Sequence, residues 1–416
     1  ATIIFTSGTT GDPKGCVLTH GNLRANALQS VDAVRDLLDT DERSLLFLPL
    51  AHAFARAIAF VGAEYGVKAA FADSLASLAD DLAVTRPTMI VAVPRVFEKA
   101  FDAAWRQARE RKMGMLFRIG TDVAVRFSRQ RASGRVTRRT RALHAVFERL
   151  IYRRVRDGFG GSLRLAFSGA SALGEELTYF FDGAGIRVFE GYGLTEASPV
   201  LTVNRAEAWR PGTVGHPVAG TRLRLGDDGE ILAAGPQIFP GYWLDPAATE
   251  ATFTPDGWLR TGDVGALDDD GFLRITGRKK DLIVTAGGKN VAPAPMEEEL
   301  RAHPMVSEAV VIGDGRPFIA ALITVDDAAF TSWRAASAFP DRSLPESVDD
   351  FELRAVVQHA VDAVNRRRSR AEQIRSFAIL PEDFSVADGE LTPTLKVRRS
   401  VIEKRYADVI EALYTR

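Results

Sequence analysis

The sequence contains only one cysteine, Cys16, in 416 residues, which excludes internal disulfides. It also contains no run of about 18 apolar residues, the length that a membrane-spanning helix requires. Neither sign of charge is in excess, because 53 lysines and arginines are balanced by 54 acidic residues. The resulting net charge of −1 excludes a globally basic nucleic-acid binder, so we expect no nucleic-acid partner. These absences predict a cytoplasmic protein, either free in the cytoplasm or bound as a peripheral protein to the inner face of the membrane.

The composition is that of a globular protein, with 46% hydrophobic and 26% charged residues. At roughly 150 residues per domain, this length predicts about three structural units. The chain begins with a strand-like run, Ala1–Phe5, without an initiator methionine or a signal peptide. We therefore expect a longer natural protein, in which a preceding region covers apolar faces and a sheet edge that would otherwise be exposed.

The run Thr6–Gly15 consists largely of hydroxyl residues and glycines and contains one lysine, Lys14. Glycines let backbone N–H groups approach bound oxygens, hydroxyls donate hydrogen bonds and lysine adds positive charge. This composition predicts a phosphate-binding loop, with a flexible polar turn as the alternative. It is not a Walker loop, because Pro13 precedes the lysine and Gly15 follows it.

Strand-length apolar runs at Ser44–Leu48, Met89–Val93 and Leu163–Phe167 alternate with helix-like segments. This alternation predicts an α/β fold with a parallel sheet. Between residues 212 and 273 the pattern changes to short alternating pieces with many turn residues, which indicates a small antiparallel β unit.

After Lys280 the pattern changes again and predicts an α+β region. A helix is expected after Pro295, and strands are expected at Glu308–Ile312 and Ile319–Thr324. A longer helix is expected from about Asp350 to Arg370.

The segment Arg95–Arg156 holds 18 lysines and arginines but only 5 acidic residues. Its apolar residues recur at roughly helical spacing, which predicts basic amphipathic helices. Such helices suit an anionic membrane surface, although a solvated basic face is the alternative. The apolar positions are Met115, Leu116, Ile119, Val123, Phe127, Leu143, Phe147 and Ile151.

Four more motifs follow the first loop in order: Gly191–Glu196, Thr261–Asp263, Gly277–Asp281 and Pro393–Lys396. Together the five motifs resemble the signatures of the adenylate-forming enzymes, the superfamily of acyl-CoA synthetases, luciferases and peptide-synthetase adenylation domains. They span nearly the whole chain.

The resemblance implies a large adenylation domain that is truncated at its N-terminus, with a parallel α/β sheet and a β subdomain. A smaller, mobile α+β domain would follow it. The implied boundaries are 1–280 for the large domain, about 212–273 for the β subdomain within it, and 281–416 for the C-terminal domain.

ATP is the nucleotide that the resemblance implies. An aromatic ring at Tyr192 would stack on adenine, and the carboxylate of Asp263 would accept hydrogen bonds from the ribose hydroxyls. The alternative for Asp263 is an Asx-turn with Gly262. The implied nucleotide-binding residues are Thr6, Ser7, Gly8, Thr9, Thr10, Gly11, Lys14, Ser168, Gly169, Ala170, Tyr192, Gly193, Thr195, Asp263 and Arg278.

Adenylation brings a carboxylate against the α-phosphate of ATP, so the site must neutralise two anions that repel each other. The resemblance implies that Mg²⁺ and the catalytic residue Lys396 do this together with Lys14. Thr195 would reach a phosphate oxygen and Glu196 would hold the metal, whereas a lone glutamate after such a turn is otherwise a surface cap. A further catalytic candidate is His52, near the expected acyl and pantetheine path, with a role in the core as the alternative.

Lys280 matches the hinge between the two domains of this superfamily. The run Gly287, Gly288 and Lys289 resembles the loop that binds CoA, with the lysine near the CoA phosphates. No covalent carrier domain is expected, because the chain ends at Arg416, soon after the Pro-Thr-Leu-Lys motif.

The surroundings of Lys396 and the helical stretch after Pro94–Glu98 resemble the long-chain members of the superfamily. The resemblance thus implies a fatty acid–CoA ligase that makes acyl-AMP and pyrophosphate from fatty acid and ATP, before CoA displaces AMP. The alternatives are a fatty acyl-AMP ligase, an aryl or medium-chain ligase, and a peptide-synthetase module. A non-catalytic, nucleotide-binding scaffold at a membrane is the alternative from another class.

Overall fold

A computed structural model describes residues 1–6, 13–39, 41–74, 77–335, 341–392 and 397–415. These residues form two compact units. The larger unit contains Ala1–Thr6, Pro13–Thr261 and Gly265–Ile275. The smaller unit contains Gly262–Val264 and the described residues of Thr276–Arg416. The predicted α/β fold, with a large N-terminal part and a smaller C-terminal part, is confirmed.

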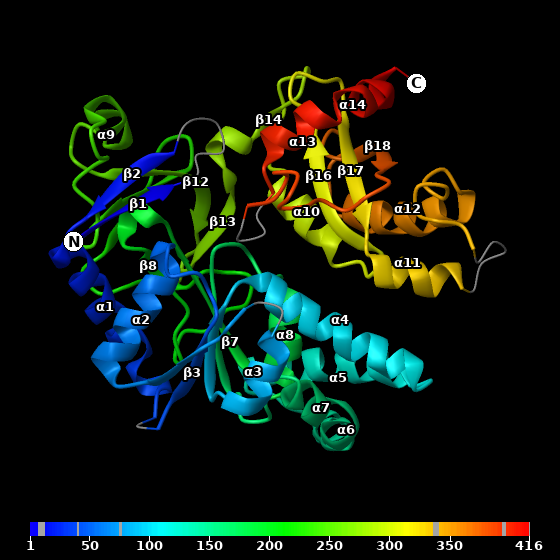
Figure 1. Cartoon of the computed structure of the whole chain (residues 1–416), viewed down its shortest axis with the longest axis horizontal. Helices are drawn as coiled ribbons and strands as arrows, with labels where there is room; N and C mark the ends of the chain where they lie inside the picture. Colours follow the sequence, from blue (N-terminus) through cyan, green and yellow to red (C-terminus); the bar gives the residue numbers. More distant parts are fainter. Residues whose placement is uncertain (7–12, 40, 75–76, 336–340, 393–396, 416) are drawn as a thin grey trace. The chain divides into compact units, whose positions relative to one another are not determined.

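The centre of the larger unit is a seven-stranded sheet with the order β4-β3-β5-β6-β7-β8-β9 (Figure 1). Neighbouring strands from β4 to β7 are parallel, whereas β8 and β9 pair antiparallel. The three apolar runs predicted as strands all lie in this sheet. The strands are β3 (Arg43–Leu46), β4 (Lys68–Phe71), β5 (Met89–Ala92), β6 (Leu165–Ser168), β7 (Arg187–Gly193), β8 (Val200–Val203) and β9 (His216–Pro217).

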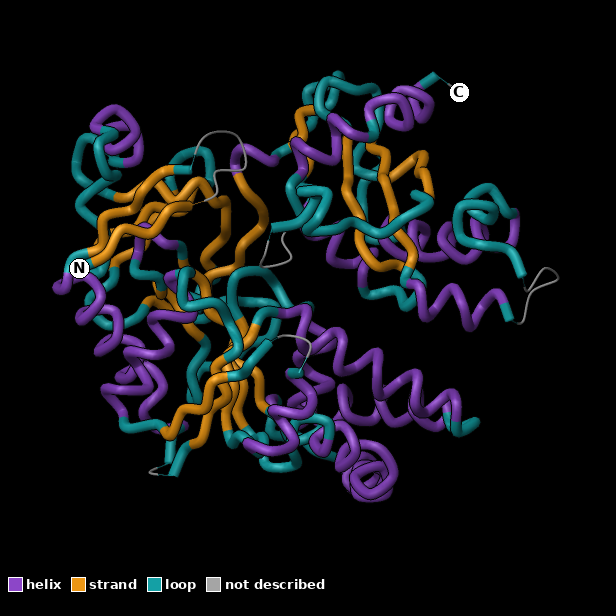
Figure 2. Tube along the Cα trace, in the orientation of Figure 1, coloured by secondary structure: helices purple, strands orange, loops and turns teal. Residues whose placement is uncertain are grey.

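Helices cover both faces of this sheet, as Figure 2 shows. On one face lie α1 (His20–Val34) and α2 (Ala53–Tyr65). On the other face lie α3 (Leu78–Thr85), α4 (Pro94–Glu110), α5 (Gly114–Ala132), α6 (Arg138–Phe147), α7 (Arg153–Asp157) and α8 (Glu175–Gly183). None of the helices in the described part of the chain is both long enough and apolar enough to cross a membrane.

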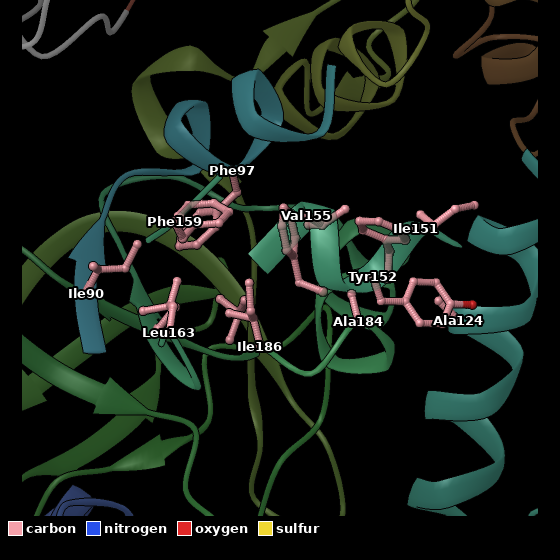
Figure 3. Close-up of a cluster of buried hydrophobic side chains, with 14 of the residues drawn as sticks. Ile90, Phe97, Ala124, Ile151, Tyr152, Val155, Phe159, Leu163, Ala184 and Ile186 are labelled. Atoms are coloured by element: carbon pink, nitrogen blue, oxygen red, sulfur yellow. The ribbon is translucent and has the colours of Figure 1, made fainter. Parts of the chain in front are cut away.

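Successive side chains of β5 contribute to different cores, because side chains alternate between the faces of a strand. Ile90 belongs to the core beneath α4 to α8, whereas Met89 and Val91 belong to the core beneath α1 and α2. In the first of these cores, Phe97 and Phe159 lie against each other with ring centroids 6.3 Å apart (Figure 3). A strand with two buried faces explains the continuous apolar runs in the sequence.

Two further sheets contain strands of the larger unit. A hairpin joins β1 (Thr2–Thr6) to β2 (Lys14–Leu18). The turn-rich segment forms a four-stranded sheet with the order β10-β11-β12-β13, as its alternating pattern predicts. Its strands are β10 (Arg222–Leu225), β11 (Glu230–Ala234), β12 (Leu259–Leu267) and β13 (Leu273–Arg278), and α9 (Pro246–Thr252) precedes β12.

The smaller unit has a three-stranded sheet with the order β16-β17-β18 and a short β14-β15 hairpin. Every residue of β16 and β17 is buried, since apolar clusters cover both faces. The strands are β14 (Ile283–Val284), β15 (Asn290–Val291), β16 (Val306–Ile312), β17 (Ile319–Val325) and β18 (Ile374–Ile379). The helices are α10 (Ala294–Arg301), α11 (Asp327–Arg334), α12 (Phe351–Asn365), α13 (Arg399–Arg405) and α14 (Ala407–Tyr414).

The predicted end of the longest helix in this unit is wrong. Helix α12 ends at Asn365 rather than near Arg370. The Asn365 amide donates to the backbone oxygen of Ile374 and accepts from its backbone nitrogen, both at 2.9 Å. These two hydrogen bonds turn the chain into β18.

Candidate functional site

The two ends of the predicted phosphate-binding loop are held by the β1–β2 hairpin. Thr6 ends β1, Lys14 begins β2, and the two residues are cross-strand partners. The Thr6 hydroxyl also donates to the backbone oxygen of Lys14 at 3.3 Å. The hairpin therefore fixes the point from which the lysine side chain extends. Five predicted loop residues lie outside the described part of the chain: Ser7, Gly8, Thr9, Thr10 and Gly11.

The run Gly191–Gly193, expected as a turn, instead forms the end of strand β7 and pairs with β8. A short 3₁₀ turn, Thr195–Ala197, follows it. A Cβ atom at Gly193 would lie only 1.9 Å from the backbone oxygen of Pro199. Only glycine fits this close approach, which also allows Leu194 N–H to donate to the same oxygen at 3.0 Å. The turn therefore presents Thr195 and Glu196 directly after the end of the strand.

The Glu196 carboxylate is held by the side chain of Tyr242, whose hydroxyl donates to Glu196 Oε1 at 2.7 Å. The Cys16 thiol, fully buried in β2, interacts electrostatically with the same carboxylate. On the same tyrosine, the ring centroid lies 5.3 Å from Lys14 Nζ. The structure thus brings two predicted residues, Lys14 and Glu196, together around Tyr242.

Both of these neighbours of Glu196 are neutral groups. Burial raises the pKa of the Cys16 thiol and of the Tyr242 hydroxyl, and the neighbouring glutamate raises both further. The Tyr242 hydroxyl can therefore orient the carboxylate without adding positive charge to it. Neither residue is evident from the sequence, because neither belongs to a motif near Glu196.

The predicted adenine-binding residues lie where two parallel strands end. Ser168, the last residue of β6, pairs with Glu190 of β7, so Gly169 and Ala170 follow at the same sheet edge as Tyr192. Ligands of open α/β sheets bind at this carboxyl edge. The Ser168 hydroxyl is buried and has no hydrogen-bond partner among the described residues.

Glu190 is a buried carboxyl that belongs to none of the five sequence motifs. It accepts hydrogen bonds from the Leu173 backbone at 3.1 Å and from the Thr178 hydroxyl at 3.3 Å. Burial raises the pKa of this group, while these hydrogen bonds act in the opposite direction. Glu190 thereby connects the start of α8 to β7, directly before the Gly-Tyr-Gly run that ends this strand.

His52 occupies the position that precedes α2. Its side chain is half-buried, and its backbone oxygen accepts from Arg56 N–H at 3.2 Å. A role near the acyl path stays a prediction.

In the smaller unit, Asp263 of β12 and Arg278 of β13 form an ion pair. Arg278 Nε lies 3.0 Å from Asp263 Oδ1. The aspartate side chain is 6% exposed, whereas the arginine side chain is 48% exposed. The structure therefore brings these two predicted ribose- and phosphate-binding residues together, with the carboxylate oriented by the guanidinium.

The predicted hinge residue, Lys280, is exposed in a 3₁₀ turn, Lys279–Asp281. The predicted CoA-binding residues follow in the turn between β14 and β15. Gly288 has φ +75° and donates its N–H to the Thr285 backbone oxygen at 2.8 Å, while Gly287 precedes it. Lys289 Nζ pairs with Glu372 Oε1 at 3.2 Å.

Lys396, the predicted catalytic lysine of this unit, lies outside the described residues. Nearby, Leu391 and Val397 form an antiparallel bridge. The catalytic role of Lys396 stays a prediction.

No group of three or more His, Cys, Asp or Glu side chains in the described ranges could hold a metal ion. Mg²⁺ does not need such a group of protein ligands, because it commonly binds one or two carboxylates together with substrate phosphates and waters. The Glu196 carboxylate, held by the neutral Tyr242 hydroxyl beside Lys14, fits this mode of binding.

Comparison with known families gives two matches. The AMP-binding enzyme family matches residues 1–243. The AMP-binding enzyme C-terminal domain matches residues 280–416.

Among curated relatives, the long-chain-fatty-acid–CoA ligase FadD15 of Mycobacterium bovis is 48% identical over 100% of this chain and 69% of its own length. Among solved structures, the adenylation domain of a carboxylate reductase from Mycobacterium chelonae has a TM-score of 0.75 at 26% identity, over 100% of this chain and 60% of that chain. ATP-bound MatB from Rhodopseudomonas palustris has a TM-score of 0.65 at 26% identity, over 98% of this chain and 68% of that chain.

Asp263→Asn should weaken AMP binding by about tenfold, because a neutral amide forms weaker hydrogen bonds with ribose hydroxyls than a carboxylate does. Isothermal titration calorimetry with AMP measures the change. Asp256→Asn is the matched control, since Asp256 is an exposed partner of Arg224, 2.8 Å away. An unchanged dissociation constant in Asp263→Asn would contradict the ribose assignment.

Proposed function

The chain belongs to the AMP-binding enzyme family, and we propose that it activates long-chain fatty acids with ATP and transfers them to coenzyme A. The main support is its 48% identity, along the whole chain, to a mycobacterial long-chain-fatty-acid–CoA ligase. The grouping of Lys14 and Glu196 around Tyr242 supports an ATP site, because it combines a cation for phosphates with a carboxylate for a metal.

In the first half-reaction, a fatty-acid carboxylate oxygen forms a bond to the α-phosphorus of ATP. The bond from that phosphorus to the bridging oxygen breaks, and pyrophosphate leaves. Lys14 and Lys396 would offset the repulsion between the two anions, Asp263 would hold the ribose and Tyr192 would stack on adenine. Mg²⁺, held through Glu196, would add positive charge at the phosphates when bound.

In the second half-reaction, the sulfur of CoA attacks the acyl carbon, AMP leaves with the electrons of the broken carbon–oxygen bond, and the thiol proton is released. The protein supplies no nucleophile, so its contribution is positioning and charge neutralisation. Backbone rotation at Lys280 would present a different face of the C-terminal domain in each half-reaction. The turn at Gly287 and Gly288, with Lys289, would then receive CoA.

The test is pyrophosphate release, measured over a series of fatty acids with and without CoA. We expect release with long chains and faster turnover when CoA is present. Release that CoA does not accelerate would favour a fatty acyl-AMP ligase, and preference for short or aromatic acids would favour an aryl or medium-chain ligase. Binding of an acyl-AMP analogue without any release would favour a non-catalytic scaffold.

Lys396→Ala should lower pyrophosphate release from fatty acid and ATP by about 10²–10³-fold, because one stabilising charge is lost where the carboxylate meets the phosphate. Thioester formation from preformed acyl-AMP should change little. Both rates are measured on the same preparation by pyrophosphate and thioester assays.

Lys404→Ala serves as the matched control, since this lysine is exposed in α13. It should leave both rates unchanged. An unaltered rate of pyrophosphate release in Lys396→Ala would remove Lys396 from the first half-reaction.

We also propose that the helical pair α4–α5 binds the anionic inner face of a membrane. The two helices are joined by residues 111–113 and pack against each other. Of the apolar positions predicted from helical spacing, Val123, Phe147 and Ile151 are buried in the core. Met115, Leu116 and Ile119 instead have exposed fractions of 79%, 42% and 44%.

These exposed apolar residues have basic neighbours in the sequence, namely the exposed residues Arg109, Arg111, Lys112 and Arg118. Apolar side chains that insert among lipids, next to cations that attract anionic headgroups, are the features of an interfacial helix. A fatty-acid substrate that partitions into membranes would suit this location.

Replacing Arg111 and Lys112 together with glutamine should weaken binding to anionic vesicles by about 30-fold, at about 1 kcal/mol for each basic residue near the surface. Co-sedimentation with phosphatidylcholine vesicles, with and without phosphatidylglycerol, measures the change. Binding of the parent protein should also fall as salt rises.

The control replaces Arg366 and Arg367, two exposed arginines directly after α12, with glutamine. It removes the same charge from a different surface and should bind like the parent. Equal binding to both vesicle types, insensitive to salt, would identify the α4–α5 surface as an ordinary solvated basic face.

A further inference from the structure

Tyr242 lies where two backbone segments of the larger unit run side by side. It forms an antiparallel bridge with Cys16 of β2. On either side of this bridge, Val17 N–H donates to the Gly241 oxygen at 3.1 Å, and Trp243 N–H donates to the Gly15 oxygen at 2.7 Å. The tyrosine is therefore fixed next to the strand that begins at Lys14.

The backbone of Tyr242 is fixed from a third direction as well. Its N–H donates to the Thr249 hydroxyl at 2.9 Å, and Thr249 belongs to α9. Its ring packs edge-on against Phe239, with centroids 4.9 Å apart. These contacts of the backbone and of the ring give the hydroxyl a defined position.

This hydroxyl donates a hydrogen bond to the Glu196 carboxylate at 2.7 Å. The backbone oxygen of Glu196 also accepts from Phe239 N–H at 2.9 Å. The glutamate is thus held at its side chain and at its backbone by residues remote from the Gly-Tyr-Gly-Leu-Thr-Glu motif.

We propose that Tyr242 is a positioning residue that holds the Glu196 carboxylate in the orientation that binds Mg²⁺ with ATP. This inference rests on the proposed role of Glu196 in metal binding. A single neutral donor suits this task because a carboxylate has about four acceptor positions, so about three remain for the metal or for its waters. A lysine or arginine in its place would repel the cation.

The two parts of the Tyr242 side chain have different partners. The ring faces the Lys14 ammonium, with 5.3 Å from Nζ to the centroid, whereas the hydroxyl contacts Glu196. Removing only the hydroxyl should therefore lower the affinity for the metal and leave the contact between Lys14 and the ring unchanged. Partners that orient a metal ligand typically contribute about 10–100-fold to metal affinity.

The experiment uses Tyr242→Phe in the whole chain. We expect the Mg²⁺ concentration for half-maximal pyrophosphate release to rise about tenfold. Calorimetry of ATP binding without fatty acid gives a readout independent of activity. The variant should bind ATP like the parent in EDTA but should lose most of the affinity that Mg²⁺ adds.

Tyr65→Phe is the matched control. The Tyr65 hydroxyl also donates one hydrogen bond at 2.9 Å, but to the backbone oxygen of Leu38. This variant should keep the parent's dependence on Mg²⁺ in both measurements.

Two results for a folded Tyr242→Phe variant would overturn the inference: an unchanged dependence on Mg²⁺, or an equal loss of ATP binding in Mg²⁺ and in EDTA. The second would show that the hydroxyl only shapes the ATP site. The Glu196→Gln variant shows whether such a result contradicts only the role of Tyr242 or also the proposed metal-binding role of Glu196. If Glu196→Gln also leaves the Mg²⁺ dependence unchanged, the metal role of Glu196 is itself wrong.

Discussion

The hydrogen bond from Tyr242 to Glu196 joins residues 46 positions apart and defines the geometry of the candidate ATP site in the larger unit. Lys14 reaches this point from the β1–β2 hairpin, and Glu196 reaches it from the turn after β7. The conformation at this turn requires a glycine at position 193, because a Cβ atom on Gly193 would collide with a backbone oxygen. The parallel sheet positions Glu196, because the turns that follow parallel strands all lie at one edge of the sheet.

The sequence predicts this framework well wherever burial alone determines structure. Strand β5 has two covered faces, so its sequence is an uninterrupted apolar run that indicates a buried strand. The end of α12 could not be found in this way, because it depends on the Asn365 side chain, whose two hydrogen bonds reach β18. Similarly, helical spacing identifies one side of α5 as apolar but cannot tell what covers it, so the exposure of Met115 became evident only in the structure.

For the candidate site, motifs identify residues whose chemistry is visible in a few neighbouring positions, such as Glu196 after its glycine turn. They do not identify groups whose role arises from contacts between distant segments. Tyr242 is an ordinary aromatic residue in the sequence, and Cys16 is notable there only for being the single cysteine. Glu190 is similar: its buried position next to α8 comes from the pairing of β6 with β7, which no local pattern records.

The cationic groups proposed to bind substrate phosphates are exposed even where they form ion pairs. The pair formed by Lys289 and Glu372 has side-chain exposures of 50% and 29%, and such surface pairs contribute only up to about 1 kcal/mol. A phosphate, with more charge than a carboxylate, can therefore displace Glu372 at little cost. Arg278 is comparable, because its side chain is 48% exposed although its partner Asp263 is buried. Binding of CoA at Lys289 thus requires only the exchange of a weak ion pair, whereas the Tyr242 hydroxyl that holds Glu196 need not move.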